Sequence, residues 1–212
     1  MSVPSPTTAL HADALAVLTA WQPPTDVQAA LRERYVAHLR AHPDGMQRSC
    51  RPDHVTASTV VLDAERRHVL LTLHAKARAW FQLGGHCEPG DTTLAGAALR
   101  EATEESGIAE LVLAPQPVHL DEHEVPFCGD APGVHHLDVR FVAVAPPGAE
   151  HTLSEESLDL RWWPVDALPD PALAEMVARA VAGPVLAQPC SVSVSSSSEG
   201  SGDSVAADQP SR

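Results

Sequence analysis

The chain places three glutamates, Glu101, Glu104 and Glu105, within little more than one helical turn. In an α-helix, positions i, i+3 and i+4 lie on one face, so the three carboxylates would lie close together. Like charges at this spacing repel one another and destabilise a bare helix. A cation would remove the repulsion, and magnesium prefers oxygen ligands, usually one or two carboxylates with substrate phosphates and water. The spacing therefore predicts a divalent-metal site that a phosphate-bearing substrate completes.

The helix that must position these carboxylates is predicted over residues 92–106. Its alanine-rich apolar positions recur at i, i+3, i+4 and i+7, as expected for a seam against a sheet. These positions are Ala95, Ala98, Leu99 and Ala102, and the candidate caps before them are Asp91, Thr92 and Thr93. Gly107 suits the left-handed position just after the helix. Arg100 offers a fixed fork of donors that could hold one carboxylate in place.

The remaining pattern predicts a mixed sheet between helical layers. Strands are expected at residues 54–63, 68–75, 79–85, 109–114, 117–125, 134–145 and 158–165, and further helices at 10–21, 25–40 and 171–182. The first two strands read as a hairpin. The second helix carries an apolar stripe that we expect to cover the domain, with a partner chain as the alternative. That stripe consists of Val27, Leu31, Tyr35 and Leu39.

Charge and composition exclude some classes of function. The formal net charge of −14 disfavours binding to a nucleic-acid polymer, because the phosphate backbone is negative. The four cysteines are widely scattered, with no CxxC pair or zinc-type spacing, which indicates reduced thiols. We find no convincing signal peptide and no apolar run of the roughly 20 residues that cross a bilayer. These features predict a soluble cytoplasmic protein without a membrane partner.

Residues 85–108 resemble the Nudix box, whose pattern is G-x5-E-x7-R-E-U-x-E-E-x-G-U, with U a bulky aliphatic residue. The second half matches from Arg100 onward, although Ala102 is smaller than the usual aliphatic residue. The first half departs from the pattern: Asp91 replaces the glutamate, and eight residues instead of seven separate it from Arg100. We expect the extra residue in the turn at 91–93, which leaves the spacing on the helix intact.

The resemblance implies a Nudix-like α/β/α sandwich with a central mixed β-sheet. It also implies a Nudix-type pyrophosphohydrolase that cleaves the diphosphate bond of a small nucleoside diphosphate-linked or nucleotide compound, with Mg²⁺ or Mn²⁺ as cofactor. The implied metal ligands are a backbone carbonyl of Gly84 or Gly85 and the side chains of Glu101, Glu104 and Glu105. The implied catalytic residues are Glu101, Glu104 and Arg100. The general base stays open between a glutamate of the box and one from a later loop, with Glu122, Glu124, Glu155 and Glu156 as the later candidates.

With the resemblance, the chain divides into three expected parts. Residues 1–50 form an N-terminal helical extension, residues 51–185 the Nudix hydrolase domain, and residues 186–212 a disordered Ser/Gly-rich acidic tail. A homodimer through the 25–40 helix is possible. Two other functions stay open on the same fold: a non-catalytic ligand-sensing module and an isoprenoid diphosphate isomerase.

A second group of polar residues alternates along two predicted strands. His119, Asp121 and His123 share one face of the first strand, and His136, Asp138 and Arg140 share one face of the second. If the strands pair, these faces could form a wall that contacts substrate, a second metal site, or a solvated surface with hydrogen-bonded histidines. The solvated surface is slightly preferred, followed by substrate contact. The candidate substrate-binding residues are His123, His136, Asp138 and Arg140.

Overall fold

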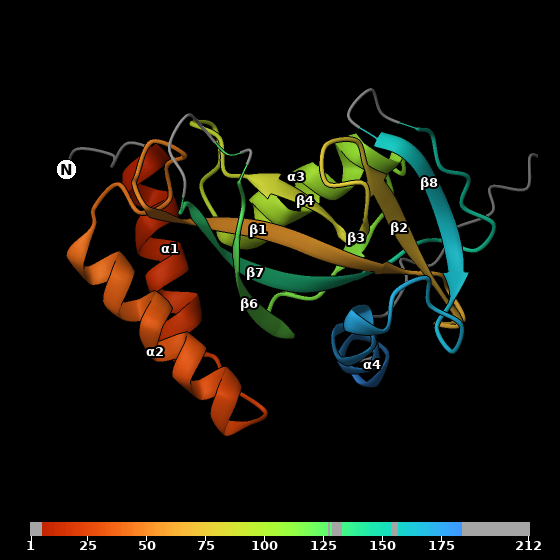
Figure 1. Cartoon of the computed structure of the whole chain (residues 1–212), viewed down its shortest axis with the longest axis horizontal. Coiled ribbons are helices and arrows are strands. Elements are labelled where there is room, and N and C mark those ends of the chain that lie inside the picture. The colour runs from red at the N-terminus through yellow and green to blue at the C-terminus, as the bar shows by residue number, and fades with distance from the viewer. Residues whose placement is uncertain (1–5, 127, 129–132, 154–156, 184–212) are drawn as a thin grey trace, which may run out of the picture.

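A long curved sheet with helices on both faces dominates the computed structural model, which describes residues 6–126, 128, 133–153 and 157–183 (Figure 1). The strands are β1 Asp53–Leu62, β2 His68–His74, β3 Trp80–Phe81, β4 Leu83–His86, β5 Val112–Leu113, β6 His119–Glu124, β7 His135–Val144 and β8 Ser157–Pro164. The helices are α1 Pro6–Ala20, α2 Asp26–Ala41, α3 Leu94–Ser106, the 3₁₀ turn η1 Pro171–Leu173 and α4 Ala174–Ala182. Each predicted element is present, except that the strand predicted at 79–85 is divided into β3 and β4, which pair with β2 and β1. The predicted tail lies outside the described residues.

Strand β1 is the centre of the sheet, because it pairs with β2, β4 and β7. Its pairing with β7 is parallel and continuous, from Asp53 opposite His135 to Leu62 opposite Val144. The other pairs are antiparallel, including the expected β1–β2 hairpin. The predicted α/β sandwich with a mixed sheet is therefore confirmed.

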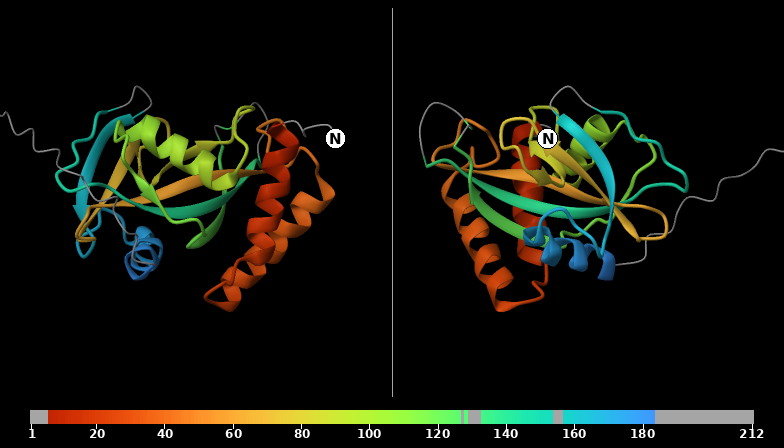
Figure 2. Two further views of the ribbon diagram at one scale, coloured as in Figure 1. Left: turned by 180° about the vertical axis from the view of Figure 1, so that it is seen from behind. Right: turned by 45° about the vertical axis from the view of Figure 1, so that its right-hand side comes forward.

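Successive side chains of β1 point to opposite faces and meet different helices. Val60 and Leu62 pack in the same cluster as Met176 and Val177 of α4, whereas Val61 packs in the cluster that contains Ala102 of α3. This period of two is the ordinary geometry of a strand buried on both faces. The two helices therefore lie on opposite sides of the sheet, as the views in Figure 2 show.

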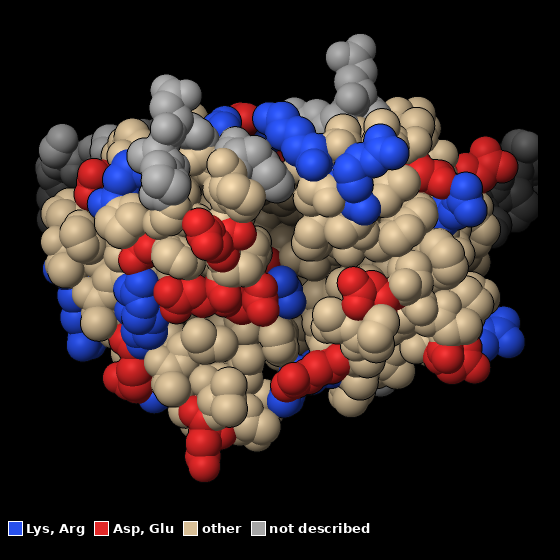
Figure 3. All heavy atoms as spheres, viewed as in Figure 1, with Lys and Arg blue, Asp and Glu red and all other residues tan. Residues whose placement is uncertain are grey.

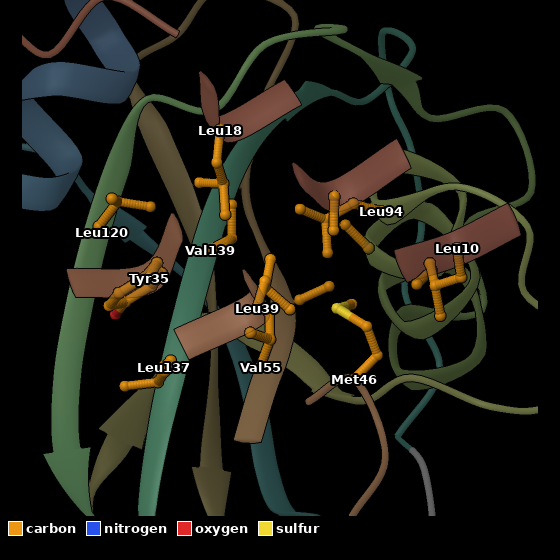
Figure 4. Close-up of a cluster of buried hydrophobic side chains, with 14 of the residues drawn as sticks. Leu10, Leu18, Tyr35, Leu39, Met46, Val55, Leu94, Leu120, Leu137 and Val139 are labelled. Carbon is orange, nitrogen blue, oxygen red and sulfur yellow. The ribbon is translucent and has the colours of Figure 1, made fainter. Parts of the chain in front are cut away.

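The N-terminal helices α1 and α2 pack against the sheet domain and extend its core (Figure 4). Leu18 of α1 and Tyr35 of α2 are almost completely buried in one cluster with Val139 of β7. The prediction that this region covers the domain is confirmed. Among the described residues, no helix has the length and hydrophobicity that a membrane crossing requires.

The predicted stripe on α2 is wrong at its first position. Val27 is 70% exposed, and the neighbouring Gln28 is buried instead. The side-chain amide of Gln28 donates to the carbonyl of Leu120 at 2.9 Å and accepts from the Leu120 N–H at 2.7 Å. Leu120 lies on β6, so Gln28 supplies the pairing that a neighbouring strand would otherwise give.

Candidate functional site

Helix α3 is fixed at both ends and along its buried face. Thr93 caps the start by accepting from the Gly96 N–H at 3.1 Å, and Gly107 follows the end with a left-handed φ of 70°. The Leu94 N–H, one of the first-turn donors, binds Asp13 of α1 at 2.7 Å. The Ala98 carbonyl accepts from the Thr59 hydroxyl of β1 at 3.0 Å, which joins the helix to the central strand.

The buried stripe of α3 differs from the predicted one. Its fully buried apolar residues are Leu94, Ala97, Ala98 and Ala102, whereas Ala95 and Leu99 are partly buried. The small alanines still bring the helix close to β1 and β4. This packing turns Glu101 and Glu105 toward the glycine pair at positions 84 and 85.

Gly84 and Gly85 of β4 lie directly beside two of the predicted metal-ligating carboxylates. The Gly84 N–H donates to Oε2 of Glu105 at 3.0 Å. A Cβ atom placed on Gly85 would lie 2.9 Å from Oε2 of Glu101. Gly84 has a φ of +151°, and a Cβ there would meet the Cα of Ser58 at 2.5 Å. Only residues without side chains allow this approach of backbone to carboxylates.

Arg100 organises the carboxylates around it. Its Nη1 donates to Glu101 at 3.1 Å and to Glu104 at 3.0 Å, and its Nη2 donates to the His86 carbonyl at 3.1 Å. Nε and Nη2 also donate to the two oxygens of Asp91, at 3.1 and 3.0 Å. Such a two-pronged pair fixes both partners in direction as well as distance.

Asp91 has a clear structural position despite its departure from the box pattern. It is 9% exposed, and its Oδ2 accepts from the Glu88 N–H at 2.8 Å in addition to its bonds with Arg100. The extra residue lies before the helix, because α3 begins at Leu94 after the Thr93 cap. Asp91 thus closes the turn and holds Arg100, so the Glu101–Glu105 spacing is unaffected.

Burial changes the acid–base behaviour of Glu101. Desolvation raises its pKa to about 7, although the adjacent Arg100 favours the charged form. Arg100 itself has a raised pKa, chiefly through its hydrogen bond to Asp91. A buried carboxylate is costly to ionise without a nearby positive charge. Three carboxylates beside the glycine backbone, with Arg100 as the cation that binds Glu101 and Glu104, fit a hard divalent ion such as Mg²⁺, which prefers oxygen ligands.

Gly85→Ala tests whether this close approach matters. We expect the fold to stay intact, because the backbone of Gly85 does not require a positive φ. Activation by Mg²⁺ should be roughly 10- to 100-fold weaker, because the new methyl group would displace the Glu101 carboxylate. Gly90→Ala is the matched control, since a Cβ there meets nothing within 4 Å. Metal titration of turnover measures both, and an equal response of the two variants would contradict the placement of Glu101.

The second predicted polar group does come together. Strands β6 and β7 pair antiparallel, with Asp121 opposite Asp138 and His123 opposite His136. Asp138 is 3% exposed and accepts from Thr56, Ser58, Gln82 and Arg140 at 3.1, 2.8, 3.0 and 2.9 Å. The preferred interpretation of a solvated face is therefore wrong for the buried Asp138, because Thr56, Ser58 and Gln82 surround its carboxylate.

The four candidate substrate contacts have different surroundings. Arg140 binds Asp121 at 2.8 Å and, with His119 and Asp121, lines a cleft of about 220 Å³ between α2 and α4. His123 is partly exposed and binds Asp121 at 2.8 Å.

On the face shown in Figure 3, acidic and basic side chains are interspersed, so the net charge of −14 does not form a single acidic field there.

His136 takes part in a cluster that the sequence did not predict, with His54, His86 and Cys128. By contrast, His119, Asp121 and His123 belong to no group of the described part of the chain whose ligand atoms converge enough to hold a metal. Strand alternation places His54 on the same face of β1 as Thr56 and Ser58, and this was the only feature of the sequence that pointed toward the cluster. Its convergence with His136 depends on the parallel β1–β7 pairing, which joins strands far apart in the sequence.

The structure describes two of the four candidate general bases from later segments, and both already have bonding partners. Glu122 is paired with Arg34 at 3.2 Å, and Glu124 accepts from the Gly133 N–H at 3.3 Å. Glu155 and Glu156 lie outside the described residues.

Cys87 packs against the core, and burial raises the pKa of its thiol to about 12, which agrees with a packing role rather than a nucleophilic one.

Comparisons with known proteins place this geometry in a family. A family model described as the NUDIX domain matches residues 52–182. A comparison with curated protein sequences found no match.

Solved structures of similar fold include a NUDIX-family hydrolase from Clostridium perfringens, at 25% identity, with 61% of this chain and 96% of that chain covered and a TM-score of 0.49. The dihydroneopterin triphosphate pyrophosphohydrolase of E. coli is 19% identical, with 60% and 94% covered and a TM-score of 0.50. The NUDIX domain of Shewanella oneidensis NrtR, solved with ADP ribose, is 15% identical, with 63% and 90% covered and a TM-score of 0.48.

The E. coli structure supports the fold alone, because its sequence identity is low. The family model carries the assignment, since it covers more than half of the chain and includes the whole of the Arg100–Glu105 segment on α3. The chain therefore belongs to the Nudix family, and it is a Nudix-type pyrophosphohydrolase.

Proposed function

We propose that this protein hydrolyses the diphosphate bond of a small nucleoside diphosphate-linked or nucleotide compound, with Mg²⁺ or Mn²⁺ as cofactor. The observation that carries the proposal is the convergence of Glu101 and Glu105 on the Gly84–Gly85 backbone, with Arg100 bonded to Glu101 and Glu104. The proposed ligands are oxygen atoms of these three glutamates and of the glycine pair. A divalent ion bound there would neutralise pyrophosphate oxygens and lower the pKa of a bound water.

The protein's own residues have distinct proposed roles. Arg100 orients Glu101 and Glu104, while Asp91 fixes Arg100 from the other side. Glu101 and Glu104 are the proposed catalytic carboxylates, because a carboxylate beside a metal-bound water can take up the proton of that water. Glu104 is the more exposed partner, with a side chain 60% exposed. It is the residue best able to reach a substrate approaching from solvent.

Substrate contact is proposed for His123 and Arg140, the two candidates with access to the surface or to the cleft. Asp138 would instead hold Arg140 in position, since it is buried and bonded to Arg140 at 2.9 Å. We further propose a domain of residues 51–185 and a cytoplasmic location. A homodimer through α2, whose Val27 is exposed, is the proposed assembly.

A substrate screen tests the proposed activity. The full chain is incubated with nucleoside triphosphates, ADP-ribose, dinucleotide polyphosphates, nucleotide sugars and coenzyme A, first with Mg²⁺ and then with Mn²⁺. Hydrolysis at a P–O–P bond should appear as two phosphate-bearing products whose masses sum to that of the substrate plus one water. Binding of these compounds without turnover would favour a ligand sensor. A rearranged isoprenoid diphosphate without phosphate release would favour an isomerase.

The raised pKa of Glu101 predicts how metal binding depends on pH. Below pH 7 the buried carboxyl holds its proton, so Mg²⁺ must displace it, and above pH 7 that cost disappears. Without metal, the folded state binds this proton more tightly than the unfolded state, so stability should fall as pH rises from about 4.5 to about 7. Added Mg²⁺ should therefore raise Tm more at pH 8 than at pH 6.

Thermal denaturation with and without Mg²⁺ at the two pH values measures this effect. Glu101→Gln removes both the titrating group and one charged ligand, so the Mg²⁺-induced shift in Tm should become smaller and lose most of its pH dependence. The same pH dependence in that variant would show that another group controls metal binding.

A further inference from the structure

Four side chains from separate parts of the fold converge at one end of the sheet. His54 comes from β1, His86 from β4, His136 from β7 and Cys128 from the segment between β6 and β7. Each offers one ligand atom, and these four atoms all lie within 4.8 Å of one another. The site is separate from the carboxylates of α3 and uses none of them.

The distances fit tetrahedral coordination. Zinc bonds to imidazole nitrogen and thiolate sulfur are about 2.0–2.3 Å long, so the ligand atoms of a tetrahedral site lie about 3.3–3.6 Å apart. Nε2 of His54 and Nε2 of His86 are 3.1 Å apart. Sγ of Cys128 lies 3.4 Å from the His86 nitrogen and 3.9 Å from the His54 nitrogen. Small side-chain rotations would bring all four atoms onto one ion.

Two of the imidazoles have the protonation state that metal binding requires. His54 is completely buried, and desolvation lowers its pKa to about 4. The same cause lowers the pKa of His136 to about 2. Both rings are therefore neutral at pH 7, with a nitrogen lone pair available. Arg51 also lies against the cluster, with its Nη1 3.9 Å from Sγ of Cys128.

A cluster held together by hydrogen bonds alone explains the arrangement less well. The Nε2 atom of His136 is buried and has no hydrogen-bond partner, a cost of roughly 1–3 kcal/mol for an ordinary buried polar atom. His86 Nε2 is close to both His54 Nε2 and Cys128 Sγ, yet one nitrogen can hold only one proton. The rings also pack face to edge, with centroids 4.8 Å apart for His86 and His136. A cation bound by all four side chains would give His136 Nε2 a partner and remove the competition for a proton at His86 Nε2.

We propose that His54, His86, His136 and Cys128 bind one Zn²⁺ ion as a closed structural site. Mixed nitrogen and sulfur ligands in tetrahedral geometry select zinc over magnesium, which prefers oxygen ligands and octahedral geometry. Four protein ligands leave no position for water, so the ion has no catalytic task of its own. It joins β1, β4 and β7 to the segment that carries Cys128. His86 also follows the glycine pair, and its carbonyl binds Arg100, so the ion would stabilise the strand that presents Gly84 and Gly85.

Metal analysis of the full-length chain tests the proposal. The protein is saturated with zinc, dialysed against excess Mg²⁺ and measured by elemental analysis, and about one zinc per chain should remain. A zinc-selective chelator in excess Mg²⁺ should lower Tm by about 5–10 °C, the shift expected when a ligand at some 100 times its Kd is removed from a domain of this size. Cobalt in place of zinc should give the charge-transfer absorption of a cobalt–thiolate bond.

Two cysteine variants identify the site. Cys128→Ser should lose the cobalt–thiolate band and most of the bound zinc, whereas Cys87→Ser, a thiol outside the cluster, should retain both. Cys50→Ser is a second control, because Cys50 belongs to another convergent group with His42 and Asp44, of which two members are exposed. If Cys128→Ser does not fold, alkylation of the unaltered protein replaces it: zinc should protect Cys128, and the chelator should expose it.

Three results would overturn the proposal. They are less than about one-tenth of a zinc per chain after saturation, zinc binding that survives Cys128→Ser, and zinc binding that is lost only in Cys50→Ser. None of these measurements depends on turnover. Failure of the zinc site is thus distinguishable from failure of the proposed hydrolase activity.

Discussion

Glu105→Gln is expected to lower metal-dependent turnover by roughly 10³-fold, because loss of a metal ligand removes several kcal/mol of transition-state stabilisation. The amide has nearly the same shape as the carboxylate and can still accept a hydrogen bond from the Gly84 N–H, now 3.0 Å from Oε2. The fold should therefore persist while the charge needed for the cation is lost. Steady-state kinetics at saturating Mg²⁺, with circular dichroism of the same sample, measures both effects.

Glu110→Gln is the matched control, since Glu110 is exposed and lies beyond the end of α3. It should leave turnover within about twofold, as expected for a surface substitution. Both variants should retain zinc as the unaltered protein does, which separates the two proposed metal sites. Unchanged turnover in Glu105→Gln would rule out Glu105 as a metal ligand.

Asp138→Ala is expected to destabilise the protein by about 3–5 kcal/mol, because it leaves the largely buried Arg140 with one carboxylate partner fewer. The side chains of Asp138 and Arg140 are 5% and 11% exposed. Thr56, Ser58 and Gln82 also lose an acceptor. For a domain of this size the loss corresponds to a fall in Tm of about 6–20 °C, measured by calorimetry or denaturant titration.

A double-mutant cycle with Arg140→Leu isolates the ion pair. The combined variant should be more stable than the sum of the single effects predicts, because it no longer contains an uncompensated buried charge. Glu175→Ala, which breaks an exposed pair with Arg179, should change stability by less than about 1 kcal/mol. Strict additivity of Asp138→Ala and Arg140→Leu would contradict energetic coupling between the two residues.

Local signals in the sequence predicted the elements and the carboxylate face of α3. The spacing of Glu101, Glu104 and Glu105, the Gly107 cap and the alternation along β6 and β7 all depend on residues close together in the chain. Such features are fixed by helix and strand geometry. They were sufficient to recognise the family and to place the strands.

The features that the sequence did not predict depend on contacts between segments far apart in the chain. The parallel contact of β1 with β7 joins His54 to His136, and the segment after β6 brings Cys128 to His86. No local pattern specifies either meeting. The burial of Gln28 in place of Val27 has the same origin, because it depends on β6 having a free edge beside α2.

The contact of Asp13 with the Leu94 N–H has a consequence for where the functional unit begins. The family match starts at residue 52, yet the donor at the first turn of the carboxylate-bearing helix finds its acceptor 81 residues earlier in the chain. A fragment trimmed to the matched residues would leave that N–H without its partner and uncover Leu94, Val55 and Val139 to water. The N-terminal segment therefore shares the core of the Nudix domain, and a fragment that begins at residue 52 should be less stable than the full chain.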